Sequence, residues 1–600
     1  MFRNSIFRAP VPGAPPPYSA IENKSCPPPE ATVAKEHKEY DPKEHPILIA
    51  IDFGTTFSPR QPAKYSKTPT LSLYEIKRTV DTDYKLTTYG WSDAMFRNNP
   101  NNVGRNDRSW LKLNTWGWNA KLQAARSKDN VILQKFKLQL DEDYCLQHPG
   151  FKIDTVQAIA DYLEPFHEYV TEAILKGFGD GFSSDKFRYC LTVPAMWSDK
   201  AKNAMRQAAI RANLIRESDH LDRLMLVTEP EAAALYCQLK CDQFSLGNKD
   251  RFMICDAGGG TVDLIVYEIE ETSSGKRLSE VTKGHGASCG STFVDQNFEK
   301  LLVKKFATQG ITLPPKVLAK VMEKFIDDIK PLFDGETEHH LDLPSNACFE
   351  DIPNEAAIGV DDGTLILDTD ELREKVFDPV VVQVFELIDQ QLVNAKSCST
   401  IFLVGGFGSS EYLLRKVKEQ FLGRVSSVNV PQRAELAVVR GAVYAGLEPK
   451  TVTVRVARRW YGLVRARPFR TGIDPPSSLS QWPDGVYCND RFSHMVEKGR
   501  RLGVDECVDT QVTYTKGVHT KGMVIIYAFN GDGQAPEHVT GNGMFKLGQI
   551  SSHEIFMPWD PPGTKKTLTF KMYFGQSEIK AVLVVDGIDY DTSLSYEESA

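Results

Sequence analysis

Two apolar segments, far apart in the chain, end in the same arrangement of an aspartate, glycine and threonine. The first reads Ile-Leu-Ile-Ala-Ile-Asp-Phe-Gly-Thr-Thr and places Asp52 just before Gly54. The second reads Ile-Cys-Asp-Ala-Gly-Gly-Gly-Thr and places Asp256 just before Gly258. A short run of β-branched and other apolar residues that stops at glycine is typical of a buried strand followed by a tight turn. We therefore expect two strand-and-turn units of the same kind.

These turns carry the residue types that bind phosphate. Glycine lets backbone N–H groups approach phosphate oxygens, threonine hydroxyls add donors, and aspartates can hold Mg²⁺ directly or through water. One such turn, taken alone, is more often an ordinary turn between two strands. Two turns that each carry a buried aspartate are different, because a buried carboxylate needs a partner and the pair suggests a shared cation. The candidate phosphate-binding residues are Gly54, Thr55, Thr56, Gly258, Gly259, Gly260 and Thr261, with Asp52 and Asp256 as the metal-binding pair.

A third small-residue turn follows the apolar strand at 399–404. It contains Gly405, Gly406 and Phe407, and a purine or ribose can pack against such bare backbone. Taken alone, this turn is better explained as a tight connection between a strand and a helix.

Strands and helices alternate along most of the chain. Apolar strand segments are expected at 188–195, 223–230, 251–269 and 399–410, and a helix at 198–214, where alanines recur with helical spacing behind Ser198 and Asp199. This alternation predicts an α/β fold. After Gly446 the helical pattern stops and short alternating segments separated by Gly, Pro and Asp predict a β-sandwich.

Composition excludes several classes of protein. Apolar residues make up 41% and charged residues 25%, which is typical of folded globular proteins, and the net charge of -8 gives no overall attraction to nucleic acid. No apolar run is long enough to span a bilayer, and the N-terminus lacks a secretory signal, so we expect a protein of the cytosol or nucleus. The 11 cysteines contain no Cys-x-x-Cys pair, which favours ordinary buried thiols over metal or disulfide sites.

Residues 1–45 are rich in proline and lack apolar periodicity, so we expect a disordered tail. Within it, Pro15-Pro16-Pro17-Tyr18 fits the pattern that WW domains bind. So short a match arises easily by chance, and a solvated tail is the better supported interpretation.

The three turns, in this order and spacing, resemble the two phosphate loops and the adenosine loop of the actin-like ATPase superfamily. Within it the chain is similar to the seventy-kilodalton heat-shock chaperones, and nearest to a divergent heat-shock-like subgroup with a shortened C-terminal region. Supporting motifs are Leu191–Ala195, Glu229–Ala234 and Arg440–Val443. The resemblance implies a nucleotide-binding domain of two lobes with a central cleft at 46–450, followed by a β-rich domain at 451–600 that resembles a lid-less peptide-binding sandwich.

The resemblance also implies roles for individual residues around ATP or ADP and Mg²⁺. Asp52 and Asp256 would position the hydrated metal, Glu229 would orient one of its waters, and Asp263 would position the attacking water. A lysine over the γ-phosphate is expected from Lys135 or Lys137, of which Lys137 is preferred, although a solvated surface position is an equal alternative. The remaining implied nucleotide contacts are Gly290, Lys330, Gly405, Gly406, Phe407 and Glu435.

The chain departs from the family pattern after the first phosphate turn. Three prolines, Pro59, Pro62 and Pro69, fall where the family has the second strand of a hairpin, and proline cannot donate to a sheet ladder. We therefore expect that strand to be missing, which would loosen Thr55 and Thr56 and slow catalysis. Cys289 and Pro331 also replace family residues beside the expected adenosine site.

Three functions are compatible with these observations. The first is an ATP-binding heat-shock-like chaperone with slow hydrolysis, for which extended or unfolded polypeptide segments are expected partners. The second is a nucleotide-sensing scaffold with little or no ATPase activity. A sugar kinase is disfavoured, because the heat-shock-like motifs at Leu191–Ala195 and Glu229–Ala234 argue against it.

Overall fold

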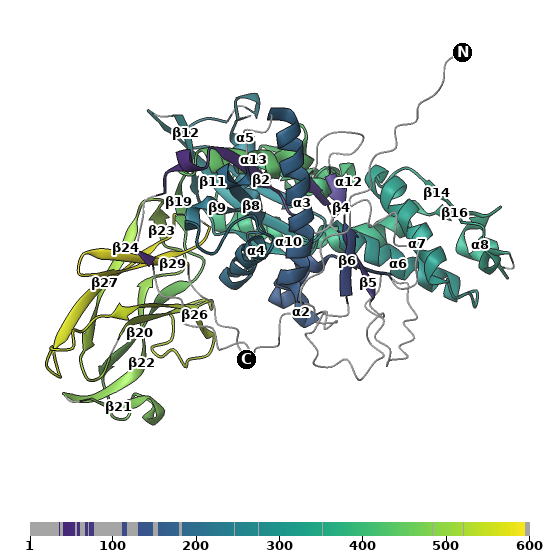
Figure 1. Cartoon of the computed structure of the whole chain (residues 1–600). Helices are drawn as coiled ribbons and strands as arrows, with labels where there is room; N and C mark the ends of the chain where they lie inside the picture. Colours follow the sequence, from purple (N-terminus) through teal and green to yellow (C-terminus); the bar gives the residue numbers. More distant parts are fainter. Residues whose placement is uncertain are drawn as a thin grey trace, which may run out of the picture.

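The structure is a computed structural model that describes residues 35–36, 40–54, 57–59, 67–69, 71–76, 111–116, 130–147, 154–178, 183–239, 241–244, 246–273, 275–350, 352–482, 484–519, 521–575 and 577–593. In this part of the chain, α/β elements form two lobes and a β-rich domain follows them (Figure 1). The order of elements is the one that the sequence predicts. None of the described helices is long and apolar enough to cross a membrane.

Lobe I is built on a parallel sheet of three strands, in the order β2 (Ile47–Ile51), β8 (Phe187–Val193) and β9 (Leu224–Thr228). Helices α3 (Thr155–Phe178) and α4 (Asp199–Arg211) pack against its apolar side chains. The hydroxyl of Ser198 accepts a hydrogen bond from the backbone N–H of Ala201 at 3.2 Å, so α4 begins at the predicted cap. The sheet thus ends in the segments that carry Asp52 and Pro194.

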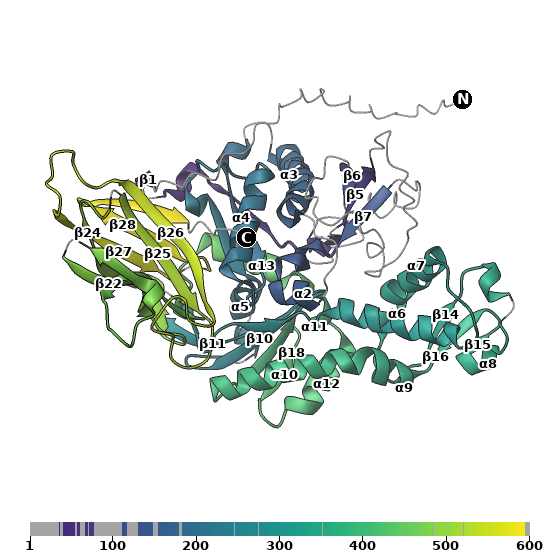
Figure 2. The ribbon, with the colours of Figure 1, turned by 90° about the horizontal axis from the view of Figure 1, so that it is seen from below.

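Lobe II is built on a mixed sheet in the order β18-β17-β10-β11-β12-β19-β23, and β13 also pairs with β11. The bounds of these strands are β10 (Arg251–Ala257), β11 (Val262–Thr272), β12 (Gly275–Glu280), β13 (His285–Ala287), β17 (Thr400–Val404), β18 (Ser427–Asn429), β19 (Val452–Val456) and β23 (Arg501–Gly503). Helices α6 (Ser291–Ala307), α7 (Pro315–Lys324), α10 (Asp378–Ala395) and α12 (Glu411–Phe421) contribute to the core on one face. Figure 2 shows α10 and α12 running side by side below this sheet.

Two helices join the lobes. Helix α5 (Glu229–Gln238) crosses α13 (Ala437–Leu447) so closely that a Cβ on Gly441 would lie 1.6 Å from the carbonyl oxygen of Ala232. Only glycine permits this approach. The apolar cluster around the crossing takes residues from both lobes, including Val227 of β9 and Ile254 of β10. The crossing therefore sets how the two lobes meet.

Smaller elements flank the lobes. Strands β14 (His339–Asp342), β16 (Thr364–Leu367) and β15 (Val360–Asp361) form one antiparallel sheet, and β6 (Leu111–Trp116), β5 (Leu71–Ile76) and β7 (Asn130–Gln134) form another. Strands β3 (Phe57–Pro59) and β4 (Lys67–Pro69) pair with each other. The sequence does not predict these two strands, but neither of them pairs with β2, so the prediction that the strand completing a hairpin with β2 is missing is not contradicted by the described strands. Pro59 and Pro69 each stand at a strand end, where proline is tolerated, whereas Pro62 lies outside the described residues. Among the described strands this pair forms a two-stranded sheet separate from β2.

The C-terminal domain is a β-sandwich. One sheet has the order β21 (Leu479–Trp482), β22 (Gly485–Val496), β20 (Trp460–Pro468), β25 (Lys521–Phe529) and β26 (Met544–Glu554). The other has the order β1 (Lys35–Glu36), β29 (Ile588–Ser593), β28 (Lys580–Val585), β27 (Lys565–Tyr573) and β24 (Cys507–Thr515). Side chains such as Leu463, Ile526, Phe570 and Leu583 fill the space between them. The sandwich therefore has an apolar core of its own.

Two short elements lie within the segment expected to be a disordered tail. Strand β1 pairs with β29, and residues Pro42–Glu44 form a 3₁₀ turn capped by Asp41. The tail prediction is therefore wrong for these residues, because partners elsewhere in the chain and a local cap order them. The WW-type motif at Pro15–Tyr18 lies outside the described residues.

Candidate functional site

The second phosphate turn connects two strands of the same hairpin. Strands β10 and β11 pair so that Asp256 lies directly opposite Asp263, and the N–H of Gly258 donates to the carbonyl of Thr261 at 2.9 Å. Asp256 is 6% exposed and Asp263 is fully buried. The hairpin thus holds two carboxylates side by side at the base of a glycine turn.

The start of helix α6 fixes the orientation of this turn. The N–H groups of Gly290, Ser291 and Thr292 donate to the carbonyls of Gly260, Gly258 and Gly259 at 3.0, 3.0 and 2.8 Å. A Cβ at Gly290 would lie 2.5 Å from the carbonyl oxygen of Gly259, so only glycine fits there. The C=O and N–H of a trans peptide point in opposite directions, so the turn amides that follow these carbonyls point away from α6. They are the amides of Gly259, Gly260 and Thr261.

The third turn packs against the second. Strand β17 runs parallel to β10, with Val404 beside Asp256, and continues into the single helical turn α11 (Gly405–Gly408). Gly405 has φ +83°, and a Cβ there would lie 2.5 Å from Oδ1 of Asp256. Gly406 is exposed with nothing near its Cβ position, whereas Phe407 is buried in the core of lobe II. Of the three predicted adenosine residues, the first two therefore offer bare backbone beside Asp256.

The first phosphate turn follows β2 in lobe I. Asp52 is 6% exposed, and its Oδ1 accepts a hydrogen bond from the hydroxyl of Thr192 on β8 at 3.0 Å. Phe53 is fully buried, and Gly54 follows it at an intermediate exposure. Thr55 and Thr56 lie outside the described residues. The structure therefore places the aspartate of this turn but not its two threonines.

One lysine is buried between the lobes. Nζ of Lys137 lies 2.6 Å from Oε1 of Glu229, and the lysine side chain is 2% exposed. The ammonium also lies 5.3 Å from the ring centroid of Trp197 and 5.9 Å from that of Phe53. Lys135, the alternative, adopts φ 56° just before the 3₁₀ turn Phe136–Leu140 and is only half-buried. Lys137 is thus the lysine that faces the buried carboxylates.

Asp263 connects lobe II to this group. Its Oδ1 accepts a hydrogen bond from the N–H of Met196 in lobe I at 3.0 Å. Its Oδ2 is buried without a hydrogen-bond partner among the described residues. Burial raises the pKa of Asp263 to about 7, and the nearby charge of Glu229 contributes to the rise. A buried acceptor that lacks a donor is costly unless a ligand or water satisfies it.

The donor set fits a divalent cation. Asp52, Glu229, Asp256 and Asp263 are each less than a tenth exposed. Within the described part of the chain, Lys137 is the buried ammonium that pairs with Glu229 and lies near Asp263. Asp256 faces Asp263 across the hairpin, and Glu229 and Lys137 lie near Asp263. Among the described residues, no three of these carboxylates bring their oxygens within 4.8 Å of one another, so Mg²⁺, which prefers oxygen ligands and keeps several of its waters, would be held partly through water.

Two of the predicted nucleotide contacts are engaged within the protein. Nζ of Lys330 lies 2.7 Å from Oδ1 of Asp295 on α6, and Oε1 of Glu435 accepts from Nε of Arg433 at 2.6 Å. Glu435 lies in the 3₁₀ turn Ala434–Leu436, which contacts α11. Each of these two side chains therefore already forms an ion pair within the protein, and this ion pair would compete with a contact to a nucleotide.

Some residues of the site were missed by sequence reasoning. The hydroxyl of Ser288 in lobe II donates to Oδ2 of Asp141 in lobe I at 2.7 Å, and Thr192 holds Asp52. A Cβ at Gly286 would lie 2.9 Å from Oδ1 of Asp263. Ser288, Thr192 and Gly286 stand in no local sequence pattern that indicates a contact with a residue far away in the chain. No sequence signal could have found the Ser288 contact.

Comparisons with known proteins agree with this architecture. Residues 182–454 match the family model described as Hsp70 protein. Heat shock 70 kDa protein 12A of Mus musculus is 24% identical over 630 aligned residues, which cover 90% of this chain and 89% of the relative. Heat shock 70 kDa protein 12A of Homo sapiens is also 24% identical, over 92% of this chain and 90% of the relative. Heat shock 70 kDa protein 12B of Homo sapiens is 23% identical, over 99% and 97%.

The matched region contains the β10–β11 hairpin, the α6 start and the third turn, while Asp52 and Lys137 precede it. The relatives extend the similarity over nearly the whole chain. The fold class expected from the sequence, an actin-like ATPase domain followed by a β-rich C-terminal domain, is confirmed. The chain therefore contains an Hsp70 domain at residues 182–454 and is similar to divergent heat shock 70 kDa proteins over most of its length.

Proposed function

We propose that this protein binds Mg·ATP between its two lobes and hydrolyses it slowly, so that the nucleotide state controls how the lobes close. The observation that carries the proposal is the buried pair of Lys137 and Glu229 beside Asp263, whose Oδ2 has no partner among the described residues. A buried carboxylate oxygen without a partner, next to a buried ion pair, is expected at a functional site rather than in a purely structural core.

Each residue has a role that follows from its position. The amides of Gly259, Gly260 and Thr261 would donate to phosphate oxygens, because the carbonyls of the turn are held by α6. Asp52 and Asp256 would hold the hydrated Mg²⁺, which neutralises charge on the phosphates. Lys137 would contact the γ-phosphate, and Glu229 keeps its ammonium in place.

Asp263 is the group that would orient the attacking water. Its Oδ1 is fixed by the N–H of Met196, which leaves Oδ2 to accept a hydrogen bond from that water. Catalysis of phosphoryl transfer depends mostly on such positioning and on charge stabilisation. Slow turnover is expected because β3 and β4 form a short, separate hairpin after the first phosphate turn.

The C-terminal sandwich is positioned to sense the nucleotide. Glu229 begins α5, and two residues later Glu231 holds the guanidinium of Arg455 on β19 at 2.6 and 2.8 Å. Arg455 also donates to the carbonyl of Gly575 at 2.8 Å, so one side chain joins α5 to the sandwich. We propose that extended polypeptide segments bind the sandwich and that their binding is coupled to the nucleotide through α5.

The alternative is a nucleotide-sensing scaffold with little or no hydrolysis. Lys330 and Glu435 favour this scaffold function, because each already forms an ion pair within the protein that competes with its contact to the adenosine. Both functions require nucleotide binding, so the two differ only in turnover.

Calorimetry of the full chain with Mg·ATP tests the shared part. We expect binding by the wild type, weaker binding by Asp256→Asn, and unchanged binding by Asp505→Asn, which alters an exposed aspartate paired with Lys450. Well-folded wild type that binds no nucleotide would exclude both functions. Single-turnover hydrolysis by the wild type but not by Asp263→Ala supports an ATPase, and binding without turnover supports the sensor.

A further inference from the structure

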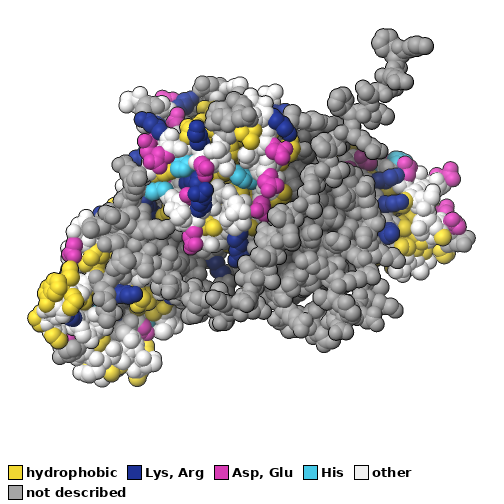
Figure 3. All heavy atoms as spheres, in the orientation of Figure 1, with side chains coloured by type: hydrophobic (Ala, Val, Ile, Leu, Met, Phe, Trp, Pro, Cys, Tyr) yellow, Lys and Arg dark blue, Asp and Glu magenta, His cyan; other side chains and the backbone are white. Residues whose placement is uncertain are grey.

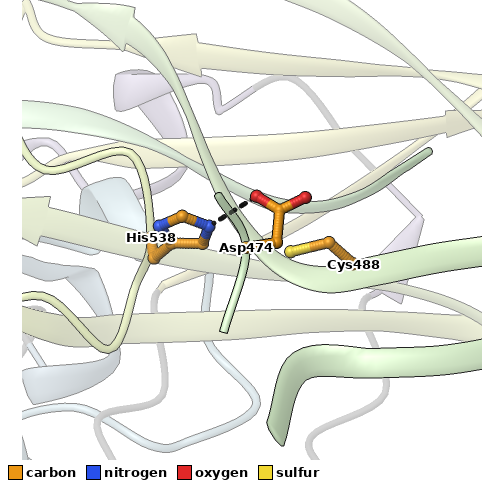
Figure 4. Close-up of side chains that lie close together, drawn as sticks. All are labelled: Asp474, Cys488 and His538. Atoms are coloured by element: carbon orange, nitrogen blue, oxygen red, sulfur yellow. Dashed lines mark hydrogen bonds and ion pairs between the residues drawn. The ribbon is translucent and has the colours of Figure 1, made fainter. Parts of the chain in front are cut away.

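Three side chains from separate segments of the sandwich converge at one end of it (Figure 4). Asp474 precedes the 3₁₀ turn Pro476–Ser478, Cys488 lies on β22, and His538 lies between β25 and β26. One ligand atom from each lies within 4.8 Å of the other two, and Oδ1 of Asp474 is 3.0 Å from Nε2 of His538. Asp474 and Cys488 are buried and His538 is nearly so.

The three atoms are of the types that zinc prefers. Zn²⁺ is bound by thiolate at about 2.3 Å and by imidazole nitrogen or carboxylate oxygen at about 2.0–2.2 Å, in tetrahedral geometry. Ligand atoms of such a tetrahedron lie somewhat over 3 Å apart, so the observed cluster needs only small side-chain movements. A structural zinc site usually adds a fourth protein ligand.

The surroundings supply both that ligand and the supporting contacts. Oδ1 of Asp490 lies 2.9 Å from Sγ of Cys488 but outside the group of three ligand atoms within 4.8 Å, so this carboxylate would have to turn toward the ion to serve as the fourth ligand. Oδ2 of Asp474 accepts from Arg491 and from the N–H of Arg470, each at 2.7 Å, and therefore the other oxygen is the one that faces His538. Hydrogen bonds of this kind orient metal ligands.

Charge does not oppose a cation at this place. The guanidinium of Arg470 lies 3.4 Å from Oδ1 of Asp474, but it also pairs with Glu537. A zinc ion bound by one thiolate, two carboxylates and one neutral imidazole would have a local net charge of about −1. The adjacent arginines would offset that charge.

We propose that Asp474, Cys488, His538 and Asp490 form a structural zinc site that ties together the three segments at this end of the sandwich. The spacing along the chain hides it, since the ligands follow no Cys-x-x-Cys or His-x-His pattern. The ion replaces the direct contact between His538 and Asp474. The competing explanation is a metal-free hydrogen-bond network in which the thiol of Cys488 donates to Asp490.

Zinc content of the full-length protein distinguishes the two explanations. After dialysis against metal-free buffer, we expect about one zinc ion per chain in the wild type and only traces in Cys488→Ser and His538→Gln. Cys507→Ser and His494→Gln are matched controls, because both residues are exposed and lie on β24 and β22. Both controls should keep their zinc.

Replacement of the zinc by Co²⁺ in the wild type needs no variant, so it tests the site even if the variants fail to fold. A thiolate-to-cobalt charge-transfer band together with tetrahedral visible bands is expected, and X-ray absorption of the zinc form should detect one sulfur neighbour. Wild type that binds neither Zn²⁺ nor Co²⁺ above the level of traces, or metal without a sulfur neighbour, would overturn the proposal in favour of the hydrogen-bond network.

Discussion

Lys137 and Glu229, 92 residues apart in the sequence, form a buried ion pair in which Nζ lies 2.6 Å from Oε1. The pair brings the segment after β7 to the start of α5, directly beside Asp263 of the other lobe. Taking both charges out of water is costly, and a buried pair is often no more stabilising than apolar residues of the same size. This cost favours the proposed role of the pair in nucleotide binding over a purely structural role.

Replacing Lys137 with methionine should slow hydrolysis more than it weakens nucleotide binding. The change removes one cation from the phosphate site, for which a loss on the order of 10²–10³-fold in turnover is expected. It also removes the ammonium that pairs with the buried Glu229, at a cost of about 3–5 kcal/mol. The double variant Lys137→Met with Glu229→Gln removes both charges of this pair and should be more stable than the single variant.

Single-turnover rates and calorimetry of both variants check this prediction. Lys176→Met is the control, because Lys176 pairs with Glu172 on the exposed face of α3. Normal turnover by Lys137→Met would show that its ammonium has no part in catalysis.

Asp263→Asn should stabilise the nucleotide-free protein at high pH. The folded state raises the pKa of Asp263 to about 7, mainly through burial, so the unfolded state releases this proton at a lower pH. At pH values between the unfolded and the folded pKa, the folded protein therefore binds one more proton than the unfolded protein. The free energy of unfolding falls as pH rises through this range. Above about pH 7 the buried carboxylate is charged, and an amide removes that cost of roughly 1–3 kcal/mol.

Thermal unfolding at pH 8 and pH 5 measures the effect. The gain from Asp263→Asn should be full at pH 8 and smaller at pH 5, where the wild-type carboxyl is protonated in the folded state. A gain that is equal at both values, or larger at pH 5, contradicts the assignment of the raised pKa. The same variant should lose hydrolysis, as is common where stability and activity conflict.

Gly405→Ala should abolish Mg·ATP binding. The residue has φ +83°, where a Cβ is strained, and that Cβ would lie 2.5 Å from the carboxylate of Asp256. The clash would displace either Asp256 or the turn Gly405–Gly408, which we propose to bind Mg²⁺ and the adenosine. Gly423→Ala, which meets no atom within 4 Å, is the control in the same calorimetric titration. Wild-type affinity in Gly405→Ala would mean that this turn can move without affecting the site.

Much of the architecture could be predicted because its signals are local. Apolar runs such as 251–257 mark buried strands, and Ser198 marks the start of α4 through its hydrogen bond to Ala201. The order of the three turns indicates the family, since each turn carries its own glycines. The family comparison then confirms the fold class.

The contacts between the lobes could not be predicted in the same way. Whether Lys135 or Lys137 turns inward depends on the left-handed conformation at position 135, which positions the 3₁₀ turn that follows. The β3–β4 pair was missed because prolines at strand ends read as strand breakers when only the sequence is known. Contacts such as Ser288 with Asp141 depend on how the lobes meet, which the crossing of α5 and α13 determines.

Glu578→Gln should loosen the sandwich from lobe I. Arg206 on α4 donates to both carboxylate oxygens of Glu578, from Nε at 3.1 Å and from one terminal nitrogen at 2.6 Å. Lys202 donates to the carbonyl of Ser577 at 2.7 Å, so the segment after β27 is held at two adjacent points. Arg206 is 6% exposed, and loss of the carboxylate would leave a buried guanidinium without its counter-charge.

Limited proteolysis and small-angle scattering of the full chain measure this loosening. We expect faster cleavage between β19 and β20 and a larger radius of gyration in Glu578→Gln, with each domain still folded by circular dichroism. Glu497→Gln is the matched control, because its carboxylate is 62% exposed at the end of β22 and lies far from α4 in the chain. If the docking is coupled to the nucleotide through Arg455 and Glu231, Mg·ATP should change the cleavage rate of the wild type more than that of Glu578→Gln. Equal responses in the two proteins would show that the Arg206 contact holds the domains together without transmitting the nucleotide state.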